Sequence, residues 1–184
     1  SKMENTTTTE TNAIELVSKI PYSVLELPVS EKFSLLERIQ ELIEKMGLPF
    51  FEVSQRYKEP QRFYHTIEHL FEVFVLIEHC RKINYFNESE RFYDLLFLID
   101  LYHDSIYNPI AYDNERDSSE LFLKDAAKSK LTEEEKNQVR LCILETKDHN
   151  PTTRLSEVFC SLDLYCLIGY PIDKLMKFEH QIFK

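Results

Sequence analysis

The chain has only two glycines, Gly47 and Gly169, among its 184 residues. Turns that need positive φ angles must therefore be few, because glycine is the residue that adopts such angles without steric cost. The same scarcity excludes a phosphate-binding P-loop, a G-x-G-x-x-G dinucleotide turn and a G-x-S-x-G nucleophile elbow. Apolar residues recur at helical spacing, and no convincing alternation typical of strands is found. The sequence therefore predicts an all-α protein.

Helix boundaries can be placed from capping residues and from proline and glycine breakers. Ser30 is the expected N-cap of the second helix, and Thr132 with Glu135 forms an expected capping box. A helix is also expected to begin after Ser89 and to end at His103 and Asp104. The other expected helices cover residues 13–19, 30–45, 50–57, 64–81, 114–127, 132–146, 153–168 and 172–184.

Residues 1–11 are polar, rich in threonine and without periodicity, so we expect a disordered tail. Ser1 and Lys2 precede Met3 and are expected to be a vector-derived addition. Residues 12–184 contain no repeat and no disordered linker, which predicts a single compact helical domain. The last predicted helix ends without a cap, which suggests either a terminal helix or a truncated chain.

Composition limits the classes of partner and the cellular compartment. The formal net charge of −10 argues against non-specific binding of nucleic acid, which depends on cationic groups. The four cysteines lack C-x-x-C spacing and lie in apolar, helix-like segments, so we expect reduced thiols and a cytoplasmic protein. No run approaches the roughly 18 apolar residues of a membrane helix, and no signal peptide is recognisable, so no membrane association is expected.

Two adjacent ionisable residues, His103 and Asp104, end the most apolar stretch of the chain, residues 92–102. Burial of an unpaired carboxylate or imidazole costs several kcal/mol, so such a pair needs a metal, a counter-charge or hydrogen bonds. His103 continues the apolar stripe of its helix and should point inward. Asp104 can turn toward the same point where the backbone leaves the helix, or it can interact with nearby backbone or an arginine.

A second set of histidines lies upstream. At 100° per residue, His65, His69 and His79 share one face of their helix, opposite an apolar stripe. A solvated face is the ordinary explanation, and it is the one we favour for His79. Val73 and Leu76 lie on or beside the same face, which weakens that explanation because they suggest a helix contacted from two sides.

Asp163 is the third case of an ionisable group beside a buried helix face, since it flanks an apolar stripe of its own helix. Together with His69, His103 and Asp104 it would provide two imidazoles and two carboxylates. This set suits an octahedral or near-octahedral site with positions left for water, holding Mn, Fe, Co, Ni or Mg. Zinc is compatible with these ligands but less typical.

Three blocks of sequence carry a more specific signal. They are Tyr57-x-Glu59-Pro60-x-Arg62-x-Tyr64-His65-x3-His69, then His103-Asp104-x2-Tyr107, then Asp113-Asn114-Glu115-x2-Ser118. With Asp163, they resemble the H…HD…D signature of the HD-domain metal-dependent phosphohydrolases, and more narrowly the bacterial branch of predicted HD superfamily hydrolases. The similarity spans residues 57–169. Relatives tend to have an Asp-x-Asp element where this chain has Ser161-Leu162-Asp163.

This resemblance implies an all-α, compact HD-domain-like bundle whose central helices hold one divalent metal between His69, His103, Asp104 and Asp163. It further implies that Asp104 orients the attacking water as well as binding the metal. His69 is preferred to His65 as the ligand, because the residues after it match the apolar pattern of the family. His65 is then expected to support a ligand or to contact substrate during catalysis.

Four more residues are expected to contact the phosphate or the rest of a substrate, by resemblance to the same branch: Arg62, Tyr107, Lys147 and His149. Ordinary surface charge is an equally good explanation for Arg62, Lys147 and His149. Glu115 is expected either to act as a general base or only to stabilise the N-terminus of its helix, where a carboxylate is favourable in any case.

The resemblance implies a metal-dependent phosphohydrolase that cleaves a phosphate ester of a small molecule, nucleotides included, through a metal-activated water. Two alternatives stay open. The first is a non-catalytic HD-like helical module that binds a metal together with a ligand or a protein partner. The second is a helical bundle whose core histidines are satisfied without any metal. The oligomeric state cannot be predicted from the sequence.

Overall fold

The computed structural model describes residues 12–62 and 66–168, and this part of the chain contains helices but no strand. The prediction of an all-α protein is confirmed. The α-helices are α2 (Ala13–Ser18), α3 (Val29–Lys45), α4 (Phe50–Gln55), α5 (Ile67–Ile83), α6 (Glu90–His103), α7 (Asn114–Ala126), α8 (Glu133–Glu145) and α9 (Arg154–Ile168), and two 3-10 helices are η1 (Tyr22–Leu25) and η2 (Arg56–Lys58).

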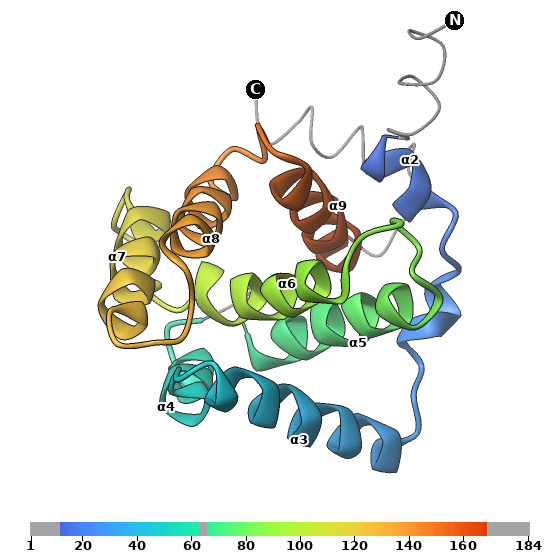
Figure 1. Cartoon of the computed structure of the whole chain (residues 1–184). Helices are drawn as coiled ribbons and strands as arrows, with labels where there is room; N and C mark the ends of the chain where they lie inside the picture. Colours follow the sequence, from blue (N-terminus) through green and yellow to red (C-terminus); the bar gives the residue numbers. More distant parts are fainter. Residues whose placement is uncertain (1–11, 63–65, 169–184) are drawn as a thin grey trace, which may run out of the picture.

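Helices α5 and α6 form the centre of the bundle (Figure 1). Helix α3 lies on one side of this pair and α9 on the other, while α7 and α8 pack at one end. Helix α6 contacts α3, α4, α5, α7, α8 and α9, and its apolar residues Leu96, Leu98 and Ile99 are fully buried. Because α6 is covered on all sides, its sequence is nearly continuously apolar. Its C-terminal residue, His103, is consequently buried inside the bundle.

One predicted N-cap is confirmed and one is wrong, and the predicted start of a helix after Ser89 is confirmed. Ser89 accepts a hydrogen bond from the backbone of Phe92 at the start of α6, and Thr132 forms the predicted capping box at the start of α8. Helix α3 begins one residue before Ser30, with Pro28 at the N-cap position and its carbonyl bonded to the amide of Lys32. Proline holds φ near the helical value, so the helix can begin directly after it without a side-chain cap.

The other boundaries shift by a few residues. The helix predicted for residues 64–81 corresponds to α5, which continues to Ile83 and ends where Asn84 adopts a left-handed conformation with φ of 46°. The helix predicted for residues 50–57 tightens into the 3-10 helix η2, which buries the side chain of Tyr57. The predicted tail of residues 1–11, His65 and the predicted helix over residues 172–184 lie outside the described residues.

The burial of the cysteines agrees with their positions in apolar segments of the sequence. All four cysteines are buried free thiols, and burial raises the pKa of Cys80 and that of Cys142 to about 12. They therefore pack as small apolar side chains. Among the described helices, none has the length and apolarity that a membrane span requires.

Candidate metal centre

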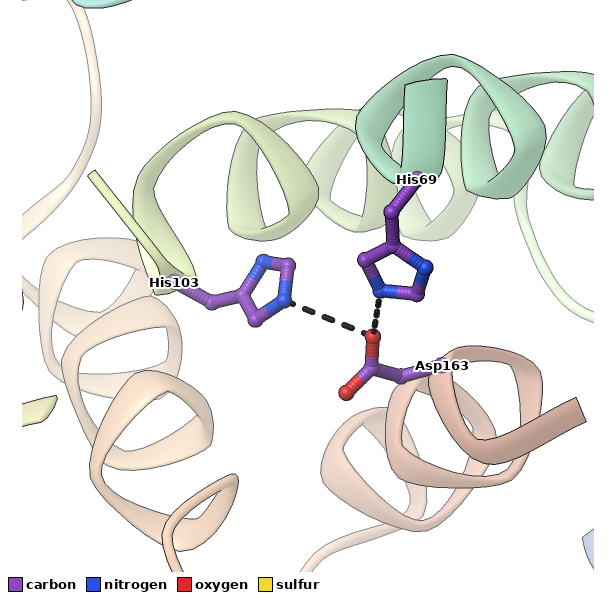
Figure 2. Close-up of side chains that lie close together, drawn as sticks. All are labelled: His69, His103 and Asp163. Atoms are coloured by element: carbon purple, nitrogen blue, oxygen red, sulfur yellow. Dashed lines mark hydrogen bonds and ion pairs between the residues drawn. The ribbon is translucent and has the colours of Figure 1, made fainter. Parts of the chain in front are cut away.

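His69, His103 and Asp163 meet in the interior although they come from three different helices (Figure 2). His69 lies in the first turn of α5, His103 ends α6, and Asp163 lies on α9. Nε2 of His69 is 2.7 Å from Oδ1 of Asp163, and Nε2 of His103 is 3.4 Å from the same oxygen. The three residues are 8%, 2% and 5% exposed. The solvated face considered for the upstream histidines is therefore wrong for His69.

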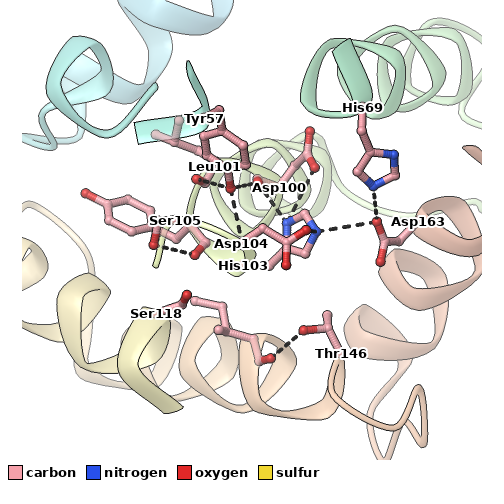
Figure 3. Close-up of polar contacts among 12 residues, drawn as sticks. Tyr57, His69, Asp100, Leu101, His103, Asp104, Ser105, Ser118, Thr146 and Asp163 are labelled. Carbon is pink, nitrogen blue, oxygen red and sulfur yellow. Dashed lines mark hydrogen bonds and ion pairs between the residues drawn. The ribbon is translucent and has the colours of Figure 1, made fainter. Parts of the chain in front are cut away.

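The end of helix α6 fixes the orientation of the His103 ring. Nδ1 of His103 lies 2.9 Å from the main-chain oxygen of Asp100, which can only accept a hydrogen bond, so Nδ1 must be the donor. The hydroxyl of Tyr57 donates to the main-chain oxygens of Asp100 and Leu101 and accepts from the amide of Asp104 (Figure 3). Because Nδ1 carries a proton, Nε2 faces Asp163 with a proton when the imidazole is charged and with a lone pair when it is neutral.

The geometry around Nε2 of His103 fits a metal ion. Among the described residues, no acceptor forms a well-directed hydrogen bond with this buried nitrogen, although oxygens of Asp104 and Asp163 lie 3.0 and 3.4 Å away. The atoms offered by His69, His103 and Asp163 all lie within 4.8 Å of one another. Ligand atoms bound to one ion at about 2.1 Å are roughly 3–4 Å apart, so the three side chains can share an ion after small adjustments.

Asp104 borders this cluster on its more exposed side. Its Oδ2 is 3.0 Å from Nε2 of His103, and its side chain is 15% exposed compared with 1% for His103. Asp104 is not among the three residues whose ligand atoms all lie within 4.8 Å of one another. A carboxylate at the edge of a buried cluster can contact both a bound ion and solvent, so the predicted roles in binding and in orienting water stay compatible with its position.

His149 contacts Asp163 from the loop between α8 and α9. Its Nε2 is 3.2 Å from Oδ2 of Asp163, and its side chain is only 7% exposed. The residue has a positive φ of 48°, which is uncommon for a residue with a side chain and gives the loop a sharp turn at this point. Asp163 is therefore approached by three histidines. The predicted contact of His149 with a substrate phosphate stays a prediction.

Arg62 holds the chain that follows Asp104. Its guanidinium is buried, donates to the main-chain oxygens of Asp104 and Ser105 at 2.6 and 2.9 Å, and pairs with Glu59 at 3.1 Å. It also lies 4.7 Å from the ring centre of Tyr57 and 5.8 Å from that of Tyr107. These contacts give Arg62 a structural role, and they place Tyr107 beside it. Contact of either residue with phosphate stays a prediction.

Glu115 and Lys147 lie together, but they line a different part of the molecule. Both border a groove of about 520 Å³ between α7 and α8, and none of the three clustered residues lines it. Nζ of Lys147 is 3.5 Å from Asp113 and 3.3 Å above the ring centre of Tyr112. Glu115 is in the first turn of α7, where its charge stabilises the helix N-terminus. The predicted His65 cannot be placed, because it lies outside the described residues.

Asp100 was not among the residues predicted from the sequence. It lies one helical turn before His103 on the same face of α6 and is completely buried. The signal that points to it is a carboxylate between Ile99 and Leu101, within the apolar stretch of residues 92–102. Its main-chain oxygen accepts a hydrogen bond from Nδ1 of His103 and so orients the ring. This contact could not be derived from the spacing of residues in the sequence.

Electrostatics couple His103 to the two carboxylates beside it. Burial alone would lower the pKa of His103, but the charges of Asp104 and Asp163 outweigh it and hold that pKa well above its ordinary value. Burial would raise the pKa of Asp163, but the charge of His103 and the contacts with His149 and His69 hold it well below its ordinary value. Without metal, the site therefore keeps a proton on His103 opposite an ionised Asp163.

A metal that binds at this site would have to displace the proton from Nε2 of His103, so its affinity is expected to depend on pH. We expect the affinity for Co²⁺ to rise up to about tenfold per pH unit until the raised pKa of His103 is passed, and to level off above it. In the metal-free protein, the contribution of His103 to folding stability changes with pH in the opposite direction. Protonated His103 contributes stability below its unfolded pKa of about 6.5, and this contribution is lost as pH rises through the folded pKa. Calorimetric titrations with Co²⁺ at several pH values test this, and an affinity independent of pH would contradict it.

Comparisons of the chain with protein-family models, with curated proteins and with solved structures give no match. The resemblance to HD-domain phosphohydrolases consequently depends on the sequence blocks described above and on the chemistry of the site.

Proposed function

We propose that this protein is a metal-dependent phosphohydrolase that cleaves a phosphate ester of a small molecule, nucleotides included. The observation that supports the proposal most directly is the buried group of His69, His103 and Asp163, in which a histidine nitrogen faces a carboxylate without a directed hydrogen bond. A buried set of nitrogen and carboxylate ligands suits Mn, Fe, Co, Ni or Zn, and Mg where water completes the coordination.

His69, His103 and Asp163 would hold the ion, with Asp104 at the exposed edge and His149 on the second oxygen of Asp163. When bound, a divalent metal supplies Lewis-acid activation of water and of a phosphoryl oxygen near neutral pH, so that no protein nucleophile is required. Asp104 would orient the attacking water, because its carboxylate lies next to the cluster and is partly exposed.

The rest of the substrate would lie on the side of the cluster where Asp104 is exposed. The chain leads from Asp104 through Tyr107 to Asp113, whose carboxylate contacts Lys147, two residues before His149. Lys147 and Glu115 both line the groove between α7 and α8, so Lys147 would meet a substrate phosphate, and Glu115 would act as a general base, only for a substrate that reaches from the cluster into that groove. The buried free thiols support a cytoplasmic location as part of the same proposal.

The test combines metal analysis with a phosphatase screen. The purified wild-type protein and an Asp104→Ala variant are loaded with Mn²⁺, Co²⁺, Ni²⁺ or Mg²⁺, and their metal content and activity on nucleotides, phosphodiesters and sugar phosphates are measured. We expect the wild type to bind metal and to hydrolyse at least one substrate class. Asp104→Ala should lower the rate about 10²–10⁴-fold, as expected for the loss of a group that moves or orients a proton.

Asp117→Ala is a suitable control, because this carboxylate is 43% exposed on α7. It should leave both metal content and rate unchanged. A wild-type protein that binds no divalent ion under any loading condition would overturn the proposal. Metal binding without turnover on the whole panel would instead favour the non-catalytic module.

A further inference from the structure

The hydroxyl group of Tyr57 lies inside the last turn of α6, although Tyr57 itself belongs to the 3-10 helix η2. It donates to the main-chain oxygens of Leu101 at 2.8 Å and Asp100 at 3.2 Å, and it accepts from the amide of Asp104 at 3.2 Å. In a regular α-helix, the amide of Asp104 would donate directly to the oxygen of Asp100, four residues earlier. The tyrosine hydroxyl is therefore inserted into the backbone hydrogen-bond ladder at the end of α6.

This insertion explains how two adjacent residues come to face one point. Neighbouring side chains in a regular helix are rotated by about 100°, so His103 and Asp104 would point in different directions. Asp104 instead has a φ of −114°, roughly 50° from the helical value, and its Oδ2 lies 3.0 Å from Nε2 of His103. Because its amide donates to the hydroxyl of Tyr57, the backbone leaves the helix at Asp104 and the carboxylate turns toward the imidazole (Figure 3).

The segment that contains Tyr57 also holds the other side of the Asp104 backbone. Arg62 donates to the main-chain oxygen of Asp104 at 2.6 Å, and its guanidinium lies 4.7 Å from the ring centre of Tyr57. The tyrosine thus holds the amide of Asp104 while the arginine holds its carbonyl group. Two residues outside the cluster therefore fix the backbone from which the Asp104 carboxylate extends.

We infer that Tyr57 is a positioning residue for Asp104, because its hydroxyl group opens the end of α6 and turns the Asp104 carboxylate toward Nε2 of His103. The consequence for metal binding rests on the proposed function, whereas the geometry of the helix end does not. Residues that orient the ligands of a metal site typically cost about 10–100-fold in metal affinity when they are lost. Tyr57 adds such a residue to a site whose predicted members all have ionisable or phosphate-binding roles.

The geometric part of the inference is tested without metal, by a crystal structure of the metal-free Tyr57→Phe variant. Phenylalanine keeps the buried ring and removes only the hydroxyl group. We expect the amide of Asp104 to donate to the main-chain oxygen of Asp100, as in a regular helix, and Oδ2 of Asp104 to move more than about 4 Å from Nε2 of His103. An Asp104 carboxylate that keeps its place beside His103 would overturn the inference, whether or not the protein binds metal.

Tyr93→Phe is the matched control, because Tyr93 is also a buried tyrosine whose hydroxyl group both donates and accepts. This hydroxyl donates to Asn84 at 2.6 Å and accepts from the amide of Phe86 at 3.2 Å. Tyr93 lies ten residues before His103 on α6, which is roughly 15 Å along the helix. Both variants lose a buried hydroxyl group, so both should lower the midpoint of thermal unfolding. Only Tyr57→Phe should change the end of α6.

Calorimetric titration with Co²⁺ tests the consequence for metal binding. We expect about a 10–100-fold loss of affinity in Tyr57→Phe, with shifted visible absorption bands of the bound Co²⁺, and wild-type behaviour in Tyr93→Phe. If Tyr57 acts through Asp104, adding Tyr57→Phe to Asp104→Ala should lower the affinity further by about twofold at most, since there is no carboxylate left to position. A side chain that only stabilises the fold would cost the same in both backgrounds.

The possible failures of the inference and of the proposed function can be distinguished. Wild-type Co²⁺ affinity in Tyr57→Phe, or an equal loss with and without the Asp104 carboxylate, would overturn the inference and leave the proposed function intact. A wild-type protein that binds no Co²⁺ would instead overturn the proposed function. The position of Asp104 in the metal-free Tyr57→Phe structure then decides the inference alone.

Discussion

Replacement of Asp163 by alanine should lower the affinity of the protein for Co²⁺ or Mn²⁺ by more than about 100-fold, beyond the loss typical of residues that only support a ligand. Asp163 contacts His69, His103 and His149. Its loss removes the carboxylate that would bind the ion and leaves three buried imidazoles without the negative charge that they share. Phosphatase activity, where present, should fall to the level of the metal-free enzyme.

The measurement is a calorimetric titration of Asp163→Ala with each metal, accompanied by circular dichroism to verify that the helices are retained. Glu157→Gln is a matched control on the same helix, because the glutamine oxygen can still accept the hydrogen bond that Glu157 receives from the amide of Ala13. The control should bind metal like the wild type. Unaltered metal affinity in a folded Asp163→Ala protein would show that the ion, if bound, lies elsewhere.

Much of the fold could be predicted because helix periodicity and capping are local properties of the sequence. Thr132 and Glu135 form their capping box from residues three apart, and Ser89 caps α6 in the same way. The start of α3 was misplaced at Ser30, because a serine is a good N-cap by composition whereas Pro28 permits a helix start by its fixed φ. Such competition between two acceptable starts is decided by packing, which the sequence does not display.

The candidate site could likewise be predicted only in part. His103 and Asp163 could be identified as candidates because they lie on or beside an apolar helix face, whereas His69 lies opposite the apolar stripe of its helix and was chosen by the family resemblance. The contact of His149 with Asp163 could not be predicted, because it depends on a loop residue with positive φ. Nor could the sequence distinguish an arginine that binds phosphate from one that binds backbone carbonyls, as Arg62 does.

Replacement of Arg62 by alanine is therefore expected to lower the free energy of unfolding, by about 2–4 kcal/mol, and to impair any activity at the same time. The guanidinium is 1% exposed and donates to the main-chain oxygens of Asp104 and Ser105. Without the guanidinium, these two main-chain oxygens lose a charged hydrogen-bond donor in the protein interior. The segment that positions Asp104 is then held less rigidly. Arg62→Lys should recover little, because one ammonium group cannot reproduce the forked geometry of the guanidinium.

Urea denaturation followed by circular dichroism measures the change in stability, with Lys58→Ala as an exposed control on the neighbouring 3-10 helix that should change little. Steady-state kinetics on the best substrate then separates the two roles of the arginine. If Arg62 acts through the backbone, kcat falls along with stability, since Asp104 is misplaced in every complex. If stability is unchanged and only KM rises, the guanidinium binds substrate phosphate, and the structural role assigned to it would be wrong.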